Sequence, residues 1–204
     1  MENALIIFVR NSEKGKVKKR LAKSIGDEKT LEVYKYLLEY TKDITIQCKC
    51  NLFVFYSHYI HINDVFDDNV FSKHVQEGDD IGERMMNAFK KVFDLGLKNI
   101  CIIGSDCYQL ETEILNEAFE KLRQSDIVIG PANDGGYYLV GMSKVYRDVF
   151  TNKDWGKTTL LNDTLETINT LGLTCSQLSQ LNNLEDIDDL LQTDILTKLE
   201  EEPL

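Results

Sequence analysis

The sequence has very little proline. Only Pro131 and Pro203 occur in 204 residues, and no stretch rich in serine, glycine and proline divides the chain. Linkers between folded units commonly have such a composition, so we expect a single domain that spans residues 1–204. Apolar residues make up 43% of the chain, enough for a substantial core. No apolar run approaches the roughly 18–20 residues that cross a bilayer, which excludes a membrane span.

The five cysteines lack paired spacing. They stand at positions 48, 50, 101, 107 and 175, without a CxxC pair. This distribution argues against a disulfide framework and against a zinc site. The first residues also lack the basic segment that opens a signal peptide. We therefore expect a cytoplasmic protein with reduced cysteines.

Positive charge is scarce but concentrated. The formal net charge is −11, from 34 acidic and 23 basic residues, and such a field repels nucleic acids and anionic membranes. Six lysines and arginines nevertheless fall within residues 14–23. This cluster is consistent with a small anionic ligand, or with an ordinary solvated helix face.

Apolar runs alternate with helical patterns. Strands are predicted at residues 4–9, 52–56, 99–104, 126–129, 137–140 and 173–178. Helices are predicted from residue 16, after Gly26, and over residues 81–93, 111–122, 161–171 and 184–199, with residues 57–75 irregular. This order predicts an α/β fold with a mostly parallel central sheet covered on both faces. Because ligands of such sheets bind beyond the carboxyl ends of the strands, the loops after Val9, Ile103 and Ile129 are site candidates.

The loop after the first strand resembles a phosphate-binding element. A glycine at position 15 allows backbone amides to approach phosphate oxygens, and lysines and an arginine follow it. Lys16 and Arg20, four residues apart, are expected on one helical face. Neither GxxxxGK[ST] nor GxGxxG is present, so this is neither a P-loop nor a dinucleotide fingerprint.

Asp106 directly follows a predicted strand in the segment Gly-Ser-Asp-Cys. A carboxylate in this place is suited to Mg²⁺ or Mn²⁺, which are held by one or two carboxylates together with substrate phosphates. The alternative is that Asp106 caps the next helix or closes a turn. Acidic residues at 185–189 open the last helix, where the helix dipole favours them, although one of them could also reach the same metal.

The segment 130–141, GPANDGGYYLVG, contains a second candidate site. Asp134 and the amides of Gly135 and Gly136 are expected to face an acceptor or a sugar, with ring contact from Tyr137 or Tyr138. The alternative is a plain hairpin turn.

Together these residues resemble a known family. The matching pieces are GKVKKRLA (15–22), QEGDDIGERMMNAF (76–89), GSDC (104–107), GPANDGGYYLVG (130–141), Trp155 with KTT, and LEDIDDL (184–190). They resemble the bacterial nucleotide-diphospho-sugar-transferase-like proteins, the radical SAM/selenodomain-associated transferases of the GT-A superfamily. Molybdenum-cofactor nucleotidyltransferases and phospholactate guanylyltransferase are more distant relatives. The sequence departs from the family pattern at Arg10, Ser12, Lys19 and Tyr108, where lysine, proline, threonine and proline are usual.

The resemblance implies a GT-A-like three-layer sandwich and a role for each matching residue. Donor phosphates would be bound by Gly15, Lys16, Lys18 and Arg20. The base or ribose would lie near Gln76, Gly78 and Gly82. The acceptor would be bordered by Asp134, Gly135 and Gly136. Mg²⁺ or Mn²⁺ would be ligated by Asp106 and, more loosely transferred, by Asp188.

The expected function is transfer from a nucleotide donor to an unknown small acceptor. Catalysis would rest on Asp106, Lys18 and Asp134, mainly through positioning and charge neutralisation. Glycosyl transfer from a nucleotide-diphospho-sugar and nucleotidyl transfer from an NTP both fit this reading. The alternative is a catalytically inactive nucleotide-binding regulatory or partner protein, suggested by the departures at Ser12, Lys19 and Tyr108.

Overall fold

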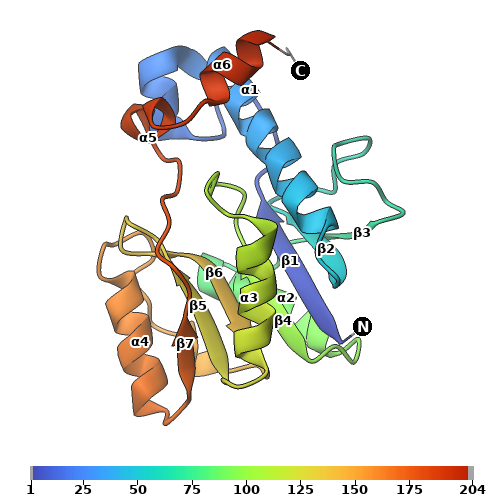
Figure 1. Cartoon of the computed structure of the whole chain (residues 1–204), viewed down its shortest axis with the longest axis vertical. Helices are drawn as coiled ribbons and strands as arrows, with labels where there is room; N and C mark the ends of the chain where they lie inside the picture. Colours follow the sequence, from blue (N-terminus) through green and yellow to red (C-terminus); the bar gives the residue numbers. More distant parts are fainter. Residues whose placement is uncertain (1, 202–204) are drawn as a thin grey trace.

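A seven-stranded sheet forms the centre of the molecule, shown in Figure 1 as a computed structural model that describes residues 2–201. The strands are β1 (Asn3–Val9), β2 (Asn51–Tyr56), β3 (Phe71–Val75), β4 (Asn99–Ile103), β5 (Ile127–Pro131), β6 (Tyr137–Met142) and β7 (Cys175–Gln177). The helices are α1 (Lys19–Ile46), α2 (Ile81–Phe93), α3 (Thr112–Leu122), the short η1 (Arg147–Val149), α4 (Leu160–Thr170), α5 (Ile187–Leu191) and α6 (Ile195–Glu201).

The strand order is β3-β2-β1-β4-β6-β5-β7. Every neighbouring pair is parallel except those of β6, which runs antiparallel to both β4 and β5. The predicted α/β fold with a mostly parallel sheet is therefore confirmed. None of the described helices is long and apolar enough to cross a membrane.

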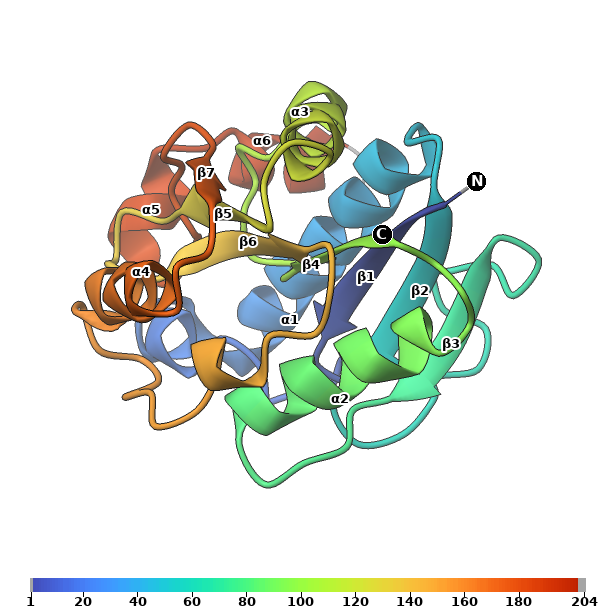
Figure 2. The same ribbon diagram turned by 90° about the horizontal axis from the view of Figure 1, so that it is seen from below.

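Both faces of the sheet are buried. On β1, Leu5 and Ile7 face α1 and α3, whereas Ala4 and Ile6 face α2 and α4. Figure 2 shows α2 on one side of the sheet and α3 on the other. All four β1 side chains are fully buried, as expected of a parallel strand with a continuous apolar sequence. The predicted three-layer arrangement is thus present.

The edge strand β3 was not predicted. Residues 57–75 were expected to be irregular, yet 71–75 pair with β2 in parallel. Only Phe71 of this strand is buried, and Ser72, Lys73 and His74 give it no apolar pattern. An edge strand needs few apolar side chains, so its sequence signal is weak.

Helix α1 begins at Lys19 and is broken at Gly26, whose φ of 79° and ψ of 163° are not helical. The expected two helices are present as two parts of this kinked element. The start expected near Lys16 was wrong, however, because residues 14–16 form a turn. Lys16 and Arg20 consequently do not share a helical face.

The C-terminal segment packs over the start of α1. The single helix expected at residues 184–199 is divided into α5 and α6, and both pack near the N-terminal part of α1 (Figure 1). Leu21, Leu37, Leu184, Leu190 and Ile195 form a small separate core here. This core brings residues 184–186 to the same edge of the sheet as the loop after β1.

Candidate functional site

A cleft of about 680 Å³ opens at the carboxyl edge of the sheet. It is lined by the end of β1, by residues that follow β1, β2, β3 and β4, by parts of α1 and α2, and by residues 155, 156 and 185. The loops after Val9 and Ile103 therefore border the cleft, as predicted. The loop after Ile129 does not contribute a lining residue.

Positive charge dominates the lining of the cleft. Its basic residues are Arg10, Lys16, Lys18, Lys19, Arg20 and Arg84. Only two acidic residues, Asp106 and Glu185, line it. In a chain with a net charge of −11, this local excess of cations favours an anionic ligand.

Lys18 lies at the centre of the charged groups. Its side chain is only 4% exposed, and its Nζ lies 2.5 Å from Asp106 Oδ1 and 3.8 Å from Glu185 Oε1. The same ammonium donates a hydrogen bond to the Leu184 carbonyl oxygen at 2.5 Å. Lys18 adopts a left-handed backbone conformation, with φ of 43°, at the N-cap of α1. This conformation costs a non-glycine residue about 1–2 kcal/mol, and here it accompanies a turn that brings the lysine beside Asp106.

Glu185 lines the cleft, but the sequence pointed to it only as one of the acidic residues at 185–189. Burial raises the pKa of its carboxyl, the negative charges of Asp106 and Asp134 raise it further, and Lys18 opposes the shift. Asp188, the residue expected to be the second metal carboxylate, is exposed on the first turn of α5 and does not line the cleft. The carboxylate that accompanies Asp106 is therefore Glu185 rather than Asp188, because the chain turns away from the cleft at the start of α5.

Two buried polar side chains hold the loops of the cleft in place. The Tyr34 hydroxyl accepts a hydrogen bond from the Arg10 amide (2.8 Å) and donates one to the Arg10 carbonyl (3.0 Å). Asn11 Oδ1 accepts from the amide of His58 (3.0 Å), and its Nδ2 donates to the carbonyl of Tyr59 (2.8 Å). Tyr34 thus anchors the loop after β1 to α1, and Asn11 joins it to the loop after β2. The sequence contained no motif that would reveal either role.

The predicted phosphate-binding residues differ in their surroundings. Lys16 pairs with Glu13 at 2.5 Å, and Arg20 pairs with Asp186 at 2.5 Å. Both line the cleft and are exposed, so a ligand can compete for them. Gly15 is exposed in the preceding turn with a φ of 74° and does not itself line the cleft.

Of the three residues expected near the base or ribose, Gln76 lines the cleft. Its Nε2 donates to the Phe55 carbonyl at 2.9 Å and to the Val9 carbonyl at 3.3 Å, which joins the ends of β1 and β2. Gly78 and Gly82 do not line the cleft but support residues that do. The Gly78 carbonyl accepts a hydrogen bond from Arg84 Nε at 2.9 Å.

Gly82 allows an aromatic ring to lie against α2. A Cβ atom at this position would lie 2.4 Å from Trp155 Cζ2 and 2.8 Å from the Phe150 carbonyl oxygen. No side chain therefore fits here without moving the segment after β6, which runs beside α2 (Figure 2). Trp155, Ile81 and Phe8 together form the apolar part of the cleft lining.

The Asp-Gly-Gly turn lies outside the cleft. The Gly135 amide donates to the Ala132 carbonyl at 3.2 Å, and the Gly136 amide donates to Asp134 Oδ1 at 2.8 Å. Neither glycine lines the cleft, and Asp134 is exposed outside it, although its charge acts on Glu185. The two amides are therefore hydrogen-bonded within the turn, and the expected contact with an acceptor stays a prediction.

The neighbouring tyrosines are also structural. The Tyr138 ring packs over Gly130, where a Cβ would lie 2.4 Å from the ring, and its hydroxyl donates to the Ser179 carbonyl at 2.9 Å. Tyr137 packs against the core that faces α2. The expected ring contact between one of these tyrosines and a ligand stays a prediction.

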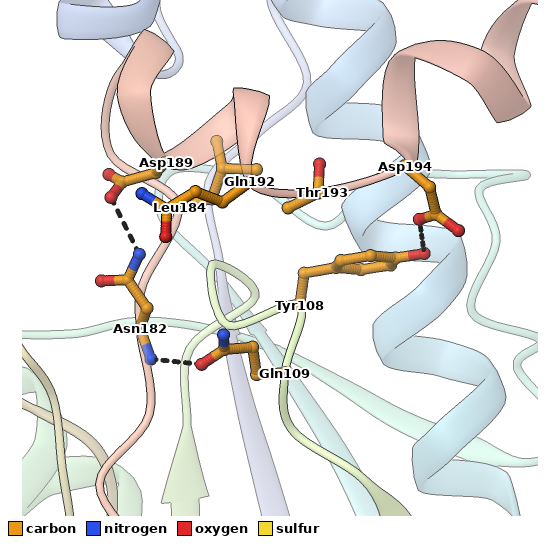
Figure 3. Close-up of a pocket in the computed structure, with 8 residues that line it drawn as sticks. All are labelled: Tyr108, Gln109, Asn182, Leu184, Asp189, Gln192, Thr193 and Asp194. Atoms are coloured by element: carbon orange, nitrogen blue, oxygen red, sulfur yellow. Dashed lines mark hydrogen bonds between the residues drawn. The ribbon is translucent and has the colours of Figure 1, made fainter.

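A second hollow, of about 400 Å³, is shown in Figure 3. It is bordered by Tyr108, whose hydroxyl donates to Asp194 at 2.8 Å, and by Asn182, whose side chain donates to Asp189 at 2.8 Å (Figure 3). No lysine or arginine is among its lining residues, so it does not suit an anion. Tyr108, which stands where the family usually has proline, joins α6 to the loop after β4 and does not line the cationic cleft.

Comparison of the chain with solved structures first defines its class of fold. A structure from Desulfovibrio desulfuricans G20, described as a "putative nucleotide-diphospho-sugar transferase", is 28% identical, covers 99% of this chain and 89% of its own, and has a TM-score of 0.88. A cytidylyltransferase from Leptospira borgpetersenii shares 12% identity over 100% of this chain and 95% of its own, with a TM-score of 0.62. The inositol-1-phosphate CTP transferase of T. maritima shares 14% identity over 98% and 97%, with a TM-score of 0.56. The fold is therefore that of nucleotidyltransferases and GT-A-like transferases.

The family follows from the sequence match. Residues 46–157, more than half of the chain, match the family described as "Uncharacterized protein conserved in bacteria (DUF2064)", and the chain belongs to this family. No curated protein matches the sequence.

Proposed function

We propose that the protein is a metal-assisted transferase that takes a nucleotide donor and binds its phosphates in the cationic cleft. The observation that carries this proposal is the group of five basic side chains that residues 10–20 contribute to the cleft, beside Asp106 and Glu185, in a chain with a net charge of −11. The likeness in fold to nucleotidyltransferases and to a nucleotide-diphospho-sugar transferase supports the same class of donor.

The residues of the cleft are chemically suited to a divalent cation that also binds the substrate. Asp106 and Glu185 offer hard carboxylate oxygens within 4 Å of the Lys18 ammonium, at 2.5 Å and 3.8 Å. Within residues 2–201, no group of three or more His, Cys, Asp or Glu side chains forms a metal site of its own. Magnesium fits such a sparse set, because it is commonly held by one or two carboxylates together with substrate phosphates. When bound there, the ion would neutralise charge on the donor's phosphates.

The protein's own residues would act mainly by position and charge. The Lys18 ammonium offsets part of the negative charge of Asp106 and Glu185, which lowers the repulsion between these carboxylates and a polyphosphate. Lys19 and Arg20, at the mouth of the cleft, would bind phosphate oxygens and stabilise the charge that develops on the leaving group. Burial of the Lys18 side chain strengthens its electrostatic effect, since little water screens it.

Binding of the donor can be tested with nucleoside triphosphates and nucleotide-sugars, each with Mg²⁺ or Mn²⁺. We expect one class to raise the melting temperature, because a ligand at a hundredfold excess over Kd stabilises a protein by about 2.7 kcal/mol. Asp106→Asn should abolish the metal-dependent part of this shift. Asp148→Asn, which changes an exposed aspartate outside the cleft, serves as the control.

The products then distinguish the two transfer reactions. Release of pyrophosphate from a triphosphate indicates nucleotidyl transfer, and release of a nucleoside diphosphate from a nucleotide-sugar indicates glycosyl transfer. Nucleotide binding without any product across a broad acceptor panel would favour a non-catalytic nucleotide-binding protein. A failure of every nucleotide to bind would refute the proposal.

A further inference from the structure

Arg84 differs from the other cations of the cleft because it is half-buried and has no carboxylate partner. Lys16, Lys18 and Arg20 each pair with a carboxylate. Arg10, Lys19 and Arg84 make no ion pair within residues 2–201, but Arg10 and Lys19 are exposed, whereas Arg84 is not. Its Nε is held by the Gly78 carbonyl at 2.9 Å, and its other N–H groups have no protein partner within residues 2–201. Arg84 is half-buried, unlike the unpaired Arg147, which is exposed outside the cleft.

An oriented, half-buried guanidinium that has no carboxylate partner can bind an external anion. Its planar fork matches a carboxylate or a phosphate with two parallel hydrogen bonds. The single hydrogen bond to Gly78 fixes part of the side chain, so less conformational freedom is lost when the anion binds. The loop that carries Gly78 is itself braced, because Glu83 accepts a hydrogen bond from the Asp79 amide at 2.9 Å.

Trp155 and Ile81 line the same cleft as Arg84 and give it an apolar surface. Trp155 lies against α2 at Gly82 and stacks on Phe150 with ring centroids 6.5 Å apart. Ile81, also in the cleft lining, is 38% exposed. A half-buried indole that borders a cleft offers a face for a ring or for the apolar body of a small molecule.

We infer that Arg84 and Trp155 form a subsite for the acceptor, and that the acceptor is a small molecule with an acidic group and a ring or apolar body. The acidic group, a carboxylate or a phosphate, binds Arg84, and the body lies on Trp155. Its identification as the acceptor rests on the proposed function, whereas binding of such a molecule does not. The paired cations around Lys18 are left for the donor.

Trp155 is the only tryptophan in the chain, so its fluorescence reports directly on this subsite. Suitable probes are phenyl phosphate and benzoate, with benzyl alcohol as a neutral analogue, titrated with and without a saturating nucleotide and Mg²⁺. We expect both anions to change the fluorescence and the neutral analogue to bind at least about tenfold more weakly, as loss of a charge-assisted pair implies. Comparing the affinities of phenyl phosphate and benzoate identifies the acidic group that the subsite prefers.

Three variants separate the subsite from the donor site. Arg84→Gln should weaken the anionic probes by about tenfold or more and leave nucleotide affinity unchanged. Arg84→Lys should restore part of the affinity, since lysine keeps the charge but not the fork. Arg147→Gln, the matched control, should behave as wild type.

The opposite results would overturn the inference. Equal binding of benzyl alcohol and benzoate, or probe affinity unaffected by Arg84→Gln, would show that no anion binds Arg84. A loss of nucleotide affinity in Arg84→Gln with unchanged probe binding would assign the arginine to the donor. Anionic probes that bind while every nucleotide fails would refute the proposed function and leave the Arg84 anion site standing.

Discussion

Replacing Lys18 by methionine tests the electrostatic centre of the cleft. Methionine keeps an unbranched side chain at a position that is 4% exposed, and it bears the same left-handed backbone cost as lysine. The substitution removes an ammonium that contacts Asp106 and the Leu184 carbonyl at 2.5 Å each and Glu185 at 3.8 Å. Both carboxylates are then left beside each other without their shared counter-charge.

The expected loss of stability is intermediate. Removing one partner of a fully buried ion pair costs about 3–5 kcal/mol. Here the side chains of Asp106 and Glu185 are 39% and 37% exposed, so water compensates part of that loss. Because a hydrogen bond to a charged group contributes about 1.5–3 kcal/mol, we expect the free energy of unfolding to fall by about 1–3 kcal/mol. For a chain of this length that corresponds to a decrease of roughly 2–12 °C in melting temperature.

Nucleotide affinity should fall at the same time. Without the ammonium, the charges of Asp106 and Glu185 repel the donor's phosphates. A loss of about 1.5–3 kcal/mol, the size of one charge-assisted contact, corresponds to a roughly 10- to 150-fold increase in Kd. Urea denaturation measures the first effect, and isothermal titration calorimetry with the nucleotide measures the second. Lys19→Met is the matched control: Lys19 is the next residue, is exposed, and makes no ion pair in residues 2–201, so stability should change by less than about 0.5 kcal/mol. A Lys18→Met protein with wild-type stability and wild-type nucleotide affinity would refute the reasoning.

Three further substitutions test other parts of the structure. Gly82→Ala should lower the free energy of unfolding by about 1–2 kcal/mol and shift the fluorescence of Trp155, because overpacking at a 2.4 Å contact outweighs the better helix propensity of alanine. Asp126→Asn should destabilise the protein at neutral pH, since hydrogen bonds from Thr174 hold the pKa of Asp126 below its ordinary value of 3.8. This contribution is present above the unfolded-state pKa and is lost as the pH falls through the lowered one, so urea denaturation should show the two proteins converging below about pH 4. Tyr108→Phe removes a hydroxyl that donates to α6, and it should cost about 0.5–1.5 kcal/mol and speed proteolysis of the C-terminal segment.

A control variant or a contradicting result tests each of these three substitutions. Gly104→Ala, where a Cβ meets no atom closer than 4.0 Å, should leave stability nearly unchanged. An unshifted Trp155 spectrum in Gly82→Ala would mean that the indole does not lie on α2. A difference between wild type and Asp126→Asn that stays constant down to pH 2 would rule out the lowered pKa as its cause. Proteolysis unaltered by Tyr108→Phe would show that α6 is held by its apolar contacts alone.

The sequence by itself determined most of the sheet and its helices. Residues such as those of β1 form a continuous apolar run, and α2 repeats its apolar residues at helical spacing, because burial imposes these periods directly on the chain. The rule that ligands bind beyond the carboxyl ends of strands then placed Asp106 and the basic loop at one edge. The structure brings these two segments together at Lys18.

Tertiary structure decided which side chains meet in the cleft. Lys18 and Leu184 are 166 positions apart, and no local pattern states that the small core around Leu21 and Leu190 brings them into contact. That packing selected Glu185 instead of Asp188, since a helix starting at Ile187 turns the later carboxylates away. Likewise, the amides of Gly135 and Gly136 form hydrogen bonds within their own turn. Lys18 has a left-handed backbone conformation, and α1 begins after it, at Lys19, rather than near Lys16. Sequence periodicity reports which residues are buried, but the position of a charged side chain depends on contacts made by segments far apart in the chain.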